Sequence, residues 1–219
     1  EDSAGNSGEL NPGDVQWMTA GRGIIHSEEP HDDFRRTGGR MHGFQIWVNL
    51  PAEHKMMAPR YQEIPSEESP TVYQEGVWAR VIAGECMGQK SSISTMIPIT
   101  LIHVRMNPDS VLSQEIESDL NSMIYVFRGK IVIDNQLEVR DHPLPRGLGV
   151  SQQVRDGELA VLSKGKKIKI RSDVDSEFLI LAGPEIDEPV ARYGPFVMNT
   201  REEINQAITD YQNGNFLNP

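Results

Sequence analysis

The sequence contains an internal repeat, which restricts its fold more than any other feature. The segment 13–21 (GDVQWMTAG) aligns without a gap to 157–165 (GELAVLSKG). In both copies an alternating segment follows, and then comes an apolar run that begins with phenylalanine and ends at proline, 44–51 (FQIWVNLP) and 178–184 (FLILAGP). Two matches in the same order predict a duplicated domain. The first copy has about ten extra residues, 31–40, which are expected to form an exposed flexible loop.

The composition indicates that the repeated domain is built from strands. The 19 glycines and 14 prolines exceed the average share and favour short strands joined by turns over long helices. A formal net charge of −11 disfavours direct binding to nucleic acid or anionic lipid. We therefore expect an all-β protein without nucleic-acid or membrane partners.

The cysteine content and the N-terminal sequence indicate the compartment. The single cysteine, Cys86, cannot form an intramolecular disulfide, and the first residues lack the basic and apolar regions of a signal peptide. The longest uncharged stretch, 91–104, is too short and too polar to span a bilayer. These observations predict a reducing, intracellular location.

The repeat and the turn residues also divide the chain. Prolines and acidic residues are frequent between Met56 and Glu75, as in a linker. Thr200 and Glu203 have the spacing of a capping box, and apolar residues follow at helical spacing. The predicted parts are the C-terminal part of a first domain (1–58), a linker (59–75), a second domain (76–198) and a C-terminal helix (199–213).

The two copies differ in how much sequence precedes them. Only 12 residues precede Gly13, whereas the strand-rich region of the second copy begins near Val77, far ahead of Gly157. The first copy is therefore expected to lack the counterparts of the strands predicted at 99–106 and 123–133. The missing stretch is roughly 70 residues long. A first domain without them would be incomplete and would expose unpaired strand edges.

One histidine lies in a pattern that suggests metal chemistry. In the segment 23–30 (GIIHSEEP), His26 and Glu28 are two residues apart, so on a strand both side chains point to the same face. An imidazole nitrogen and a carboxylate oxygen suit iron, manganese or nickel. The same pattern also occurs as a solvated or structural pair, and two ligands do not complete a metal site. In the second copy the equivalent residues are Ile170 and Ser172, so that copy is expected to bind no metal.

The remaining candidates carry weaker signals. His42 lies near the start of a predicted strand and faces either the same cavity or a glycine turn, while His103 and His142 are expected to be structural or solvated. Cys86 lacks a close basic neighbour and is expected to be a buried hydrophobic residue. The sequence contains no phosphate-binding loop, nucleophile elbow, paired cysteines or dinucleotide fingerprint.

Longer motifs resemble the pirin family. They are the run 12–28, the segments 43–51 (GFQIWVNLP) and 58–62 (APRYQ), and the close of the chain, 194–200 (GPFVMNT) with 202–208. Pirins are bicupins, so the resemblance implies two tandem cupin β-barrels, the first incomplete here, with a short C-terminal helix. It also implies iron bound in the first cupin by three histidines and a glutamate, and a metal-free second cupin. His26 and Glu28 match two of these ligands, whereas the family's His-x-His motif would precede the first residue.

The resemblance implies two functions from different classes. One is a quercetin 2,3-dioxygenase-type activity of the full-length form, which uses non-haem iron or another divalent metal, a flavonol-type substrate and dioxygen. The metal ligands would be the only catalytic residues. Four apolar residues are candidates for the substrate pocket or, alternatively, for the barrel core: Trp17, Met18, Phe44 and Trp47.

The second function is a non-catalytic, iron- and redox-dependent transcription co-regulator in the nucleus and cytoplasm of a eukaryotic cell. Such a protein would bind a transcription-factor partner, and the acidic charge fits this better than direct contact with DNA. A monomer is expected in either case. A third interpretation is that this chain performs neither function, because its first domain cannot close.

Overall fold

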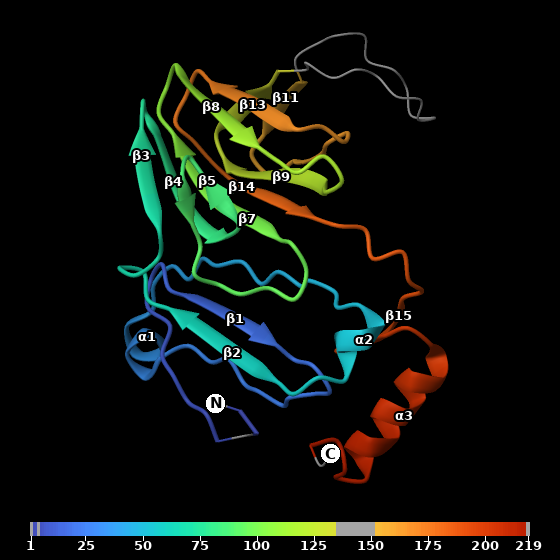
Figure 1. Cartoon of the computed structure of the whole chain (residues 1–219). Coiled ribbons are helices and arrows are strands. Elements are labelled where there is room, and N and C mark those ends of the chain that lie inside the picture. The colour runs from blue at the N-terminus through green and yellow to red at the C-terminus, as the bar shows by residue number, and fades with distance from the viewer. Residues whose placement is uncertain (1, 4, 135–151, 218–219) are drawn as a thin grey trace. The chain divides into compact units, whose positions relative to one another are not determined.

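The computed structural model describes residues 2–3, 5–134 and 152–217. These residues form two compact units (Figure 1, coloured by residue number). Unit 1 comprises Glu1–Ser66 and Ile186–Pro219, and unit 2 comprises Glu67–Glu185. Most regular elements are strands, so the all-β prediction is confirmed. No helix in the described ranges is both long enough and apolar enough to cross a lipid bilayer.

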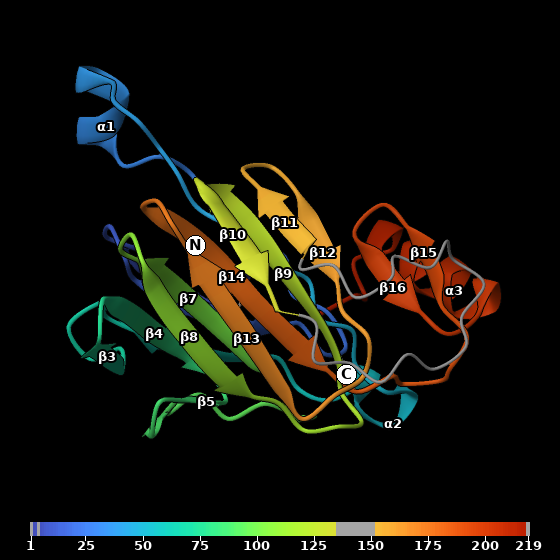
Figure 2. The ribbon, with the colours of Figure 1, turned by 90° about the horizontal axis from the view of Figure 1, so that it is seen from above.

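Unit 2 contains two larger antiparallel sheets (Figure 2). The six-stranded sheet has the order β12-β9-β14-β7-β4-β3 and the four-stranded sheet the order β11-β10-β13-β8. A short hairpin is formed by β5 (Glu85–Cys86) and β6 (Gln89–Lys90). The strands of the two sheets are β3 (Thr71–Gln74), β4 (Val77–Ala83), β7 (Thr100–Met106), β8 (Ser110–Glu115), β9 (Asn121–Arg128), β10 (Lys130–Ile133), β11 (Gln152–Arg155), β12 (Leu159–Val161), β13 (Lys167–Ser172) and β14 (Ser176–Gly183).

The core of unit 2 follows from the alternation of its strands. Along β4, β8 and β13, every second residue is buried, as expected where one face of each strand packs inward. The largest fully buried side chain is Phe178 of β14, which packs in a cluster with Ile102, Ile124 and Ile170. Complete burial of such a side chain contributes about 1.5–3 kcal/mol. Apolar packing therefore accounts for the closed interior of unit 2.

Unit 1 contains less regular structure. β1 (Val15–Thr19) pairs with β2 (Arg60–Ile64), and β15 (Ala191–Tyr193) pairs with β16 (Phe196–Met198). The helices are α1 (Asp32–Thr37), α2 (Ala52–Lys55) and α3 (Arg201–Gln212). The insertion 31–40, expected as a flexible loop, instead contains α1, whose first turn is capped by the His31 side chain accepting from Asp33 N at 3.2 Å.

The units divide the chain differently from the predicted domains. The expected linker 59–75 contains β2, which pairs in unit 1, and β3, which pairs with β4 in unit 2. Residues 186–198, expected in the second domain, cluster with unit 1. The prolines that suggested a linker, Pro59, Pro65 and Pro70, flank these strands without interrupting them, so they do not remove ladder hydrogen bonds.

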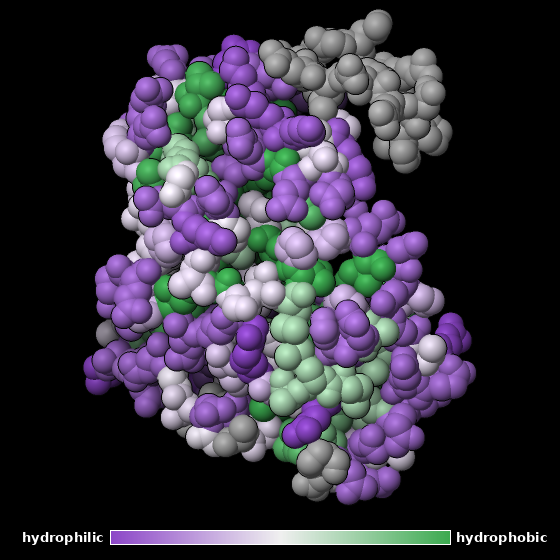
Figure 3. All heavy atoms as spheres, viewed as in Figure 1, coloured by the Kyte–Doolittle hydropathy of each residue, from purple (hydrophilic) through white to green (hydrophobic). Residues whose placement is uncertain are grey.

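Polar side chains cover much of the face shown in Figure 3, and apolar side chains reach the surface between them. Several large apolar residues are exposed in unit 1, including Met41 at 73% and Trp47 at 56%. Single exposed apolar residues are normal, but these two lie in a segment without regular structure, 38–50. This segment contains the predicted strand 44–51.

The capping box of α3 provides a first testable effect. Thr200 Oγ1 accepts from Glu203 N at 3.2 Å, and Glu203 Oε2 accepts from Thr200 N at 2.8 Å. Thr200→Ala is expected to lower the free energy of unfolding by about 1 kcal/mol, because an N–H of the first turn loses its acceptor. Urea denaturation measures this change. Thr209→Ala is the control, because it replaces a mid-helix threonine, whose hydroxyl donates to Asn205 O, by a better helix former. An equal loss of stability in Thr209→Ala would contradict the capping argument.

Candidate metal centre

The segment around His26 is held by the N-terminal residues rather than by a strand ladder. Asp2 and His26 form an isolated antiparallel bridge. Ser3 N donates to Ile25 O at 2.7 Å, and Ile25 N donates to Ser3 Oγ at 3.1 Å. The sequence predicts a strand here, but the structure has a single bridge.

His26 and Glu28 lie on the same side of this segment, as their spacing predicts. His26 Nδ1 is 3.8 Å from Glu28 Oε1, and the two side chains are 28% and 57% exposed. The other oxygen, Glu28 Oε2, accepts from Gln45 Nε2 at 3.3 Å. Gln45 comes from a distant part of the sequence and restrains the carboxylate, and the sequence analysis did not identify it.

The two side chains fit a divalent metal in donor type but not in number. Within residues 2–3, 5–134 and 152–217, no group of three or more histidine, cysteine, aspartate or glutamate side chains is arranged to hold a metal ion. Non-haem iron sites typically have two histidines and one carboxylate. The described part of the chain therefore presents a partial ligand set.

Tyr61 is a second residue that the sequence analysis did not identify. It lies on β2 opposite Met18 of β1. Burial, then the Asp2 carboxylate, and then the negative charges of Glu28 and Glu63 raise the pKa of Tyr61 to about 12. Its phenol is therefore neutral at physiological pH and lies near the Glu28 carboxylate. The signal that could have identified it is the APRYQ segment at 58–62, which was noted only as a family motif.

The four predicted pocket residues occupy two different environments. Trp17 and Met18 are half-buried in β1, whereas Phe44 and Trp47 are 45% and 56% exposed in the segment 38–50. The strand predicted at 44–51 is not formed. Its counterpart in the repeat, β14, is hydrogen-bonded to a neighbouring strand on each side, and strand conformation depends on such partners. A shared pocket for the four side chains stays a prediction.

The other predicted residues have separate roles. His42 contacts Phe44 with ring centroids 5.4 Å apart, and the strand expected beside it is absent. His103 is in unit 2 and lies 2.9 Å from Glu177 Oε1. Cys86 is buried, and burial raises the pKa of its thiol to about 11, which fits the expected hydrophobic role. His142 lies outside the described residues.

The equivalents of the metal pair in the second copy serve the packing of unit 2. Ile170 is fully buried in the apolar core. Ser172 Oγ lies 2.9 Å from Lys130 O and 2.7 Å from Val174 O, so its hydroxyl is engaged with the backbone of two turns. These contacts explain why an isoleucine and a serine suit these two positions.

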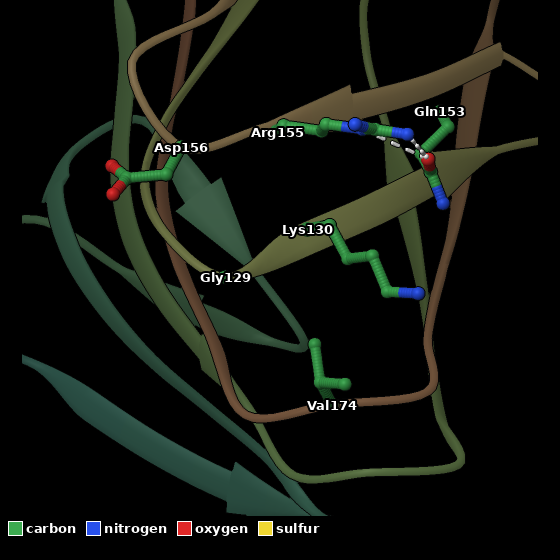
Figure 4. Close-up of a pocket in the computed structure, with 6 residues that line it drawn as sticks. All are labelled: Gly129, Lys130, Gln153, Arg155, Asp156 and Val174. Atoms are coloured by element: carbon green, nitrogen blue, oxygen red, sulfur yellow. Dashed lines mark hydrogen bonds between the residues drawn. The ribbon is translucent and has the colours of Figure 1, made fainter.

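Unit 2 also has a shallow depression of about 430 Å³ (Figure 4). The Arg155 guanidinium along one wall donates to Gln153 Oε1 at 2.9 Å, and Lys130 Nζ is 3.0 Å from Asp173 Oδ2. Both cations are therefore already paired with protein acceptors. The depression does not include His26 or Glu28. The residues that line it are Gly129, Lys130, Gln153, Arg155, Asp156 and Val174.

Comparison with known proteins gives a consistent result. Residues 101–217 match the family model described as the pirin C-terminal cupin domain, and residues 1–48 match the model described as pirin. Pirin from Homo sapiens is 39% identical over 97% of this chain and 68% of its own length. A pirin-like protein from Solanum lycopersicum is 37% identical over 98% of this chain and 68% of its own length.

A solved structure agrees with these relatives. The crystal structure of quercetin 2,3-dioxygenase from Acinetobacter baumannii is similar to this structure with a TM-score of 0.85 at 31% sequence identity. The similarity covers 99% of this chain and 71% of that chain. The cupin fold expected from the sequence is therefore confirmed.

Proposed function

Because this chain belongs to the pirin family, we propose that His26 and Glu28 are two of the ligands of a metal site with quercetin 2,3-dioxygenase-type activity, and that iron is the metal in the full-length form. The observation that carries the proposal is the His26–Glu28 pair, with both side chains on one side of the segment and 3.8 Å between Nδ1 and Oε1. The similarity to the Acinetobacter baumannii enzyme supports the choice of reaction.

The neighbouring residues would prepare the two ligands for binding. The Gln45 amide restrains one carboxylate oxygen of Glu28, and the backbone bridge to Asp2 restrains His26. Such contacts orient the metal ligands. Removing an outer-shell contact of this kind typically lowers metal affinity by roughly ten- to a hundredfold. The proposal requires further ligands from outside the part of the chain that the structure describes, because two ligands are fewer than the usual three.

The substrate side of the proposal concerns the exposed apolar residues of unit 1. A flavonol is a planar aromatic molecule, and exposed aromatic rings such as Phe44 and Trp47 can bind it by stacking. Arg192 Cζ lies 5.1 Å from the centroid of the Trp47 ring, so the guanidinium packs over one face of that ring. We therefore include Phe44 and Trp47 in the proposed substrate site.

Elemental analysis of the purified full-length form tests the proposal. After incubation with ferrous iron and desalting, this parent protein is expected to retain iron, because it supplies the further ligands. His26→Ala and Glu28→Gln are expected to reduce the iron content to background, because each removes one ligand. His54→Ala is the matched control, since His54 also faces a carboxylate, Glu53, with Nε2 3.5 Å from Oε1. Dioxygen consumption with quercetin should follow the iron content across the four proteins.

Two outcomes would contradict this assignment. Iron retained equally by the parent and His26→Ala would show that the metal binds elsewhere. Iron retained by the parent without any quercetin-dependent dioxygen consumption would support the ligands but reject the reaction.

A further inference from the structure

The six-stranded sheet of unit 2 carries a row of five side chains, one from each of five adjacent strands. The strand register places Tyr73, Trp78, Arg105, Glu177 and Arg128 opposite one another in this order. Residues that pair directly point to the same face of a sheet. A β-bulge shifts the register at Arg128, and the 4.0 Å between Arg128 Nη1 and Glu177 Oε2 places Arg128 beside the row. This face is the one opposite the core, because the chain neighbours of Trp78 and Arg105 belong to the buried cluster. We call these five residues the arginine row.

The two guanidinium groups of the arginine row are accessible, and one of them is held in place. Arg105 Nε donates to Glu177 Oε1 at 2.7 Å, and Arg105 Cζ lies 4.6 Å from the centroid of the Trp78 ring. Arg128 Nη1 lies 4.0 Å from Glu177 Oε2. The arginine side chains are 59% and 68% exposed, whereas Glu177 is only 16% exposed. Glu177 therefore orients Arg105 and lies beside Arg128, while both arginine side chains stay accessible to a ligand.

Glu177 itself is fixed by a histidine from the adjacent strand. His103 Nε2 lies 2.9 Å from Glu177 Oε1, and the His103 ring meets the Trp78 ring edge-on, with 5.2 Å between centroids. Although burial favours the protonated carboxyl, hydrogen bonds from Arg105 and His103 hold the pKa of Glu177 below its usual value. The acceptor that orients Arg105 is thus ionised at neutral pH.

We propose that the arginine row binds a short peptide segment that carries a carboxylate beside an aromatic residue. A guanidinium group binds a carboxylate in a planar, bidentate arrangement. Tyr73 on β3, which is 65% exposed, offers ring surface for the aromatic residue. This proposal does not depend on the metal site.

The surroundings of the row favour a short segment over a polyanion. The turns that border this end of the sheet contain Glu75, Asp109 and Asp175. These carboxylates, together with the formal net charge of −11, would repel the successive phosphates of a nucleic acid. A single carboxylate carries less charge than a run of phosphates, so these acidic residues repel it less.

Fluorescence anisotropy with a fluorescein-labelled peptide of glutamate and phenylalanine tests the proposal. The parent chain is expected to bind it saturably at low ionic strength. Arg105→Gln and Arg128→Gln are each expected to weaken binding about tenfold, as for the loss of one hydrogen-bonded charge. Arg155→Gln is the matched control, because it removes an exposed arginine of unit 2 whose guanidinium donates to Gln153 Oε1 on the other sheet of that unit. Its affinity should stay within about twofold of the parent.

Three results would overturn the proposal. The first is no saturable binding by the parent. The second is a loss of peptide affinity in Arg155→Gln equal to that in the row variants, or equal binding of a peptide with glutamine in place of glutamate. Either would show that the row does not specifically recognise the carboxylate. The third is tighter binding of single-stranded oligouridine than of the peptide. Arg128 is mostly exposed and lacks a close hydrogen bond, so Arg128→Gln keeps the test valid even if Arg105→Gln fails to fold.

Discussion

Phe178→Ala is expected to lower the free energy of unfolding of unit 2 by about 3–5 kcal/mol. Phe178 is fully buried on β14, and its register partners are Val104 on β7 and Val126 on β9. Removing the ring takes away apolar contacts and leaves a cavity, because closely packed neighbours relax only in part. Urea denaturation measures the loss, and hydrogen exchange of peptides from β7 and β9 assigns it to unit 2.

Val111→Ala is the control for this effect. Val111 is on β8 and 45% exposed, so its truncation removes little buried surface and should change stability by less than about 0.5 kcal/mol. If Phe178→Ala also cost less than about 1 kcal/mol, the ring would not be an essential part of the core.

Lys55→Ala is expected to have the second large effect, a loss of about 1–3 kcal/mol in unit 1. Lys55 is only 5% exposed, and its Nζ donates to Asn49 Oδ1 at 2.7 Å and to Leu50 O at 2.5 Å. Burial lowers the pKa of Lys55, while the charges of Glu188 and Glu203 oppose this shift. Removing the cation leaves two half-buried acceptors unpaired and takes away a positive charge that attracts Glu188 and Glu203.

The contacts of Glu188 explain why this effect should extend along the chain. Glu188 Oε2 accepts from Ala52 N at 2.7 Å and from Asn199 Nδ2 at 2.9 Å, so it links α2 to the segment that leads into α3. Hydrogen exchange in α3 should therefore increase in Lys55→Ala. In Lys90→Ala, which alters an exposed lysine on β6, exchange and stability should be unchanged. If hydrogen exchange in α3 were unchanged in Lys55→Ala, Lys55 would not support the contacts of Glu188.

Local patterns predicted the regular parts of the structure well. The alternating segment after Gly165, which forms β13, and the capping box before α3 depend on residues close in the sequence, and both are found in the structure. His26 and Glu28 also lie on the same side of their segment, as their spacing of two residues predicts.

Predictions that required distant partners were less successful. The segment 44–51 has the composition of β14 but is not a strand, and the proposed linker 59–75 contains β2 and β3. Gln45 and Tyr61 were missed as neighbours of Glu28 for the same reason, because they approach it from other parts of unit 1.

The order of amino acids was thus sufficient for the all-β class, the capped helix and the placement of His26 beside Glu28, while the internal duplication stays a prediction. Tertiary structure decided which strand-like segments form strands, which residues surround Glu28, and where five strands align Arg105 and Arg128 beside Glu177. Backbone hydrogen bonds between strands and packing between distant side chains exist only once the chain has folded, and local sequence does not specify the partners.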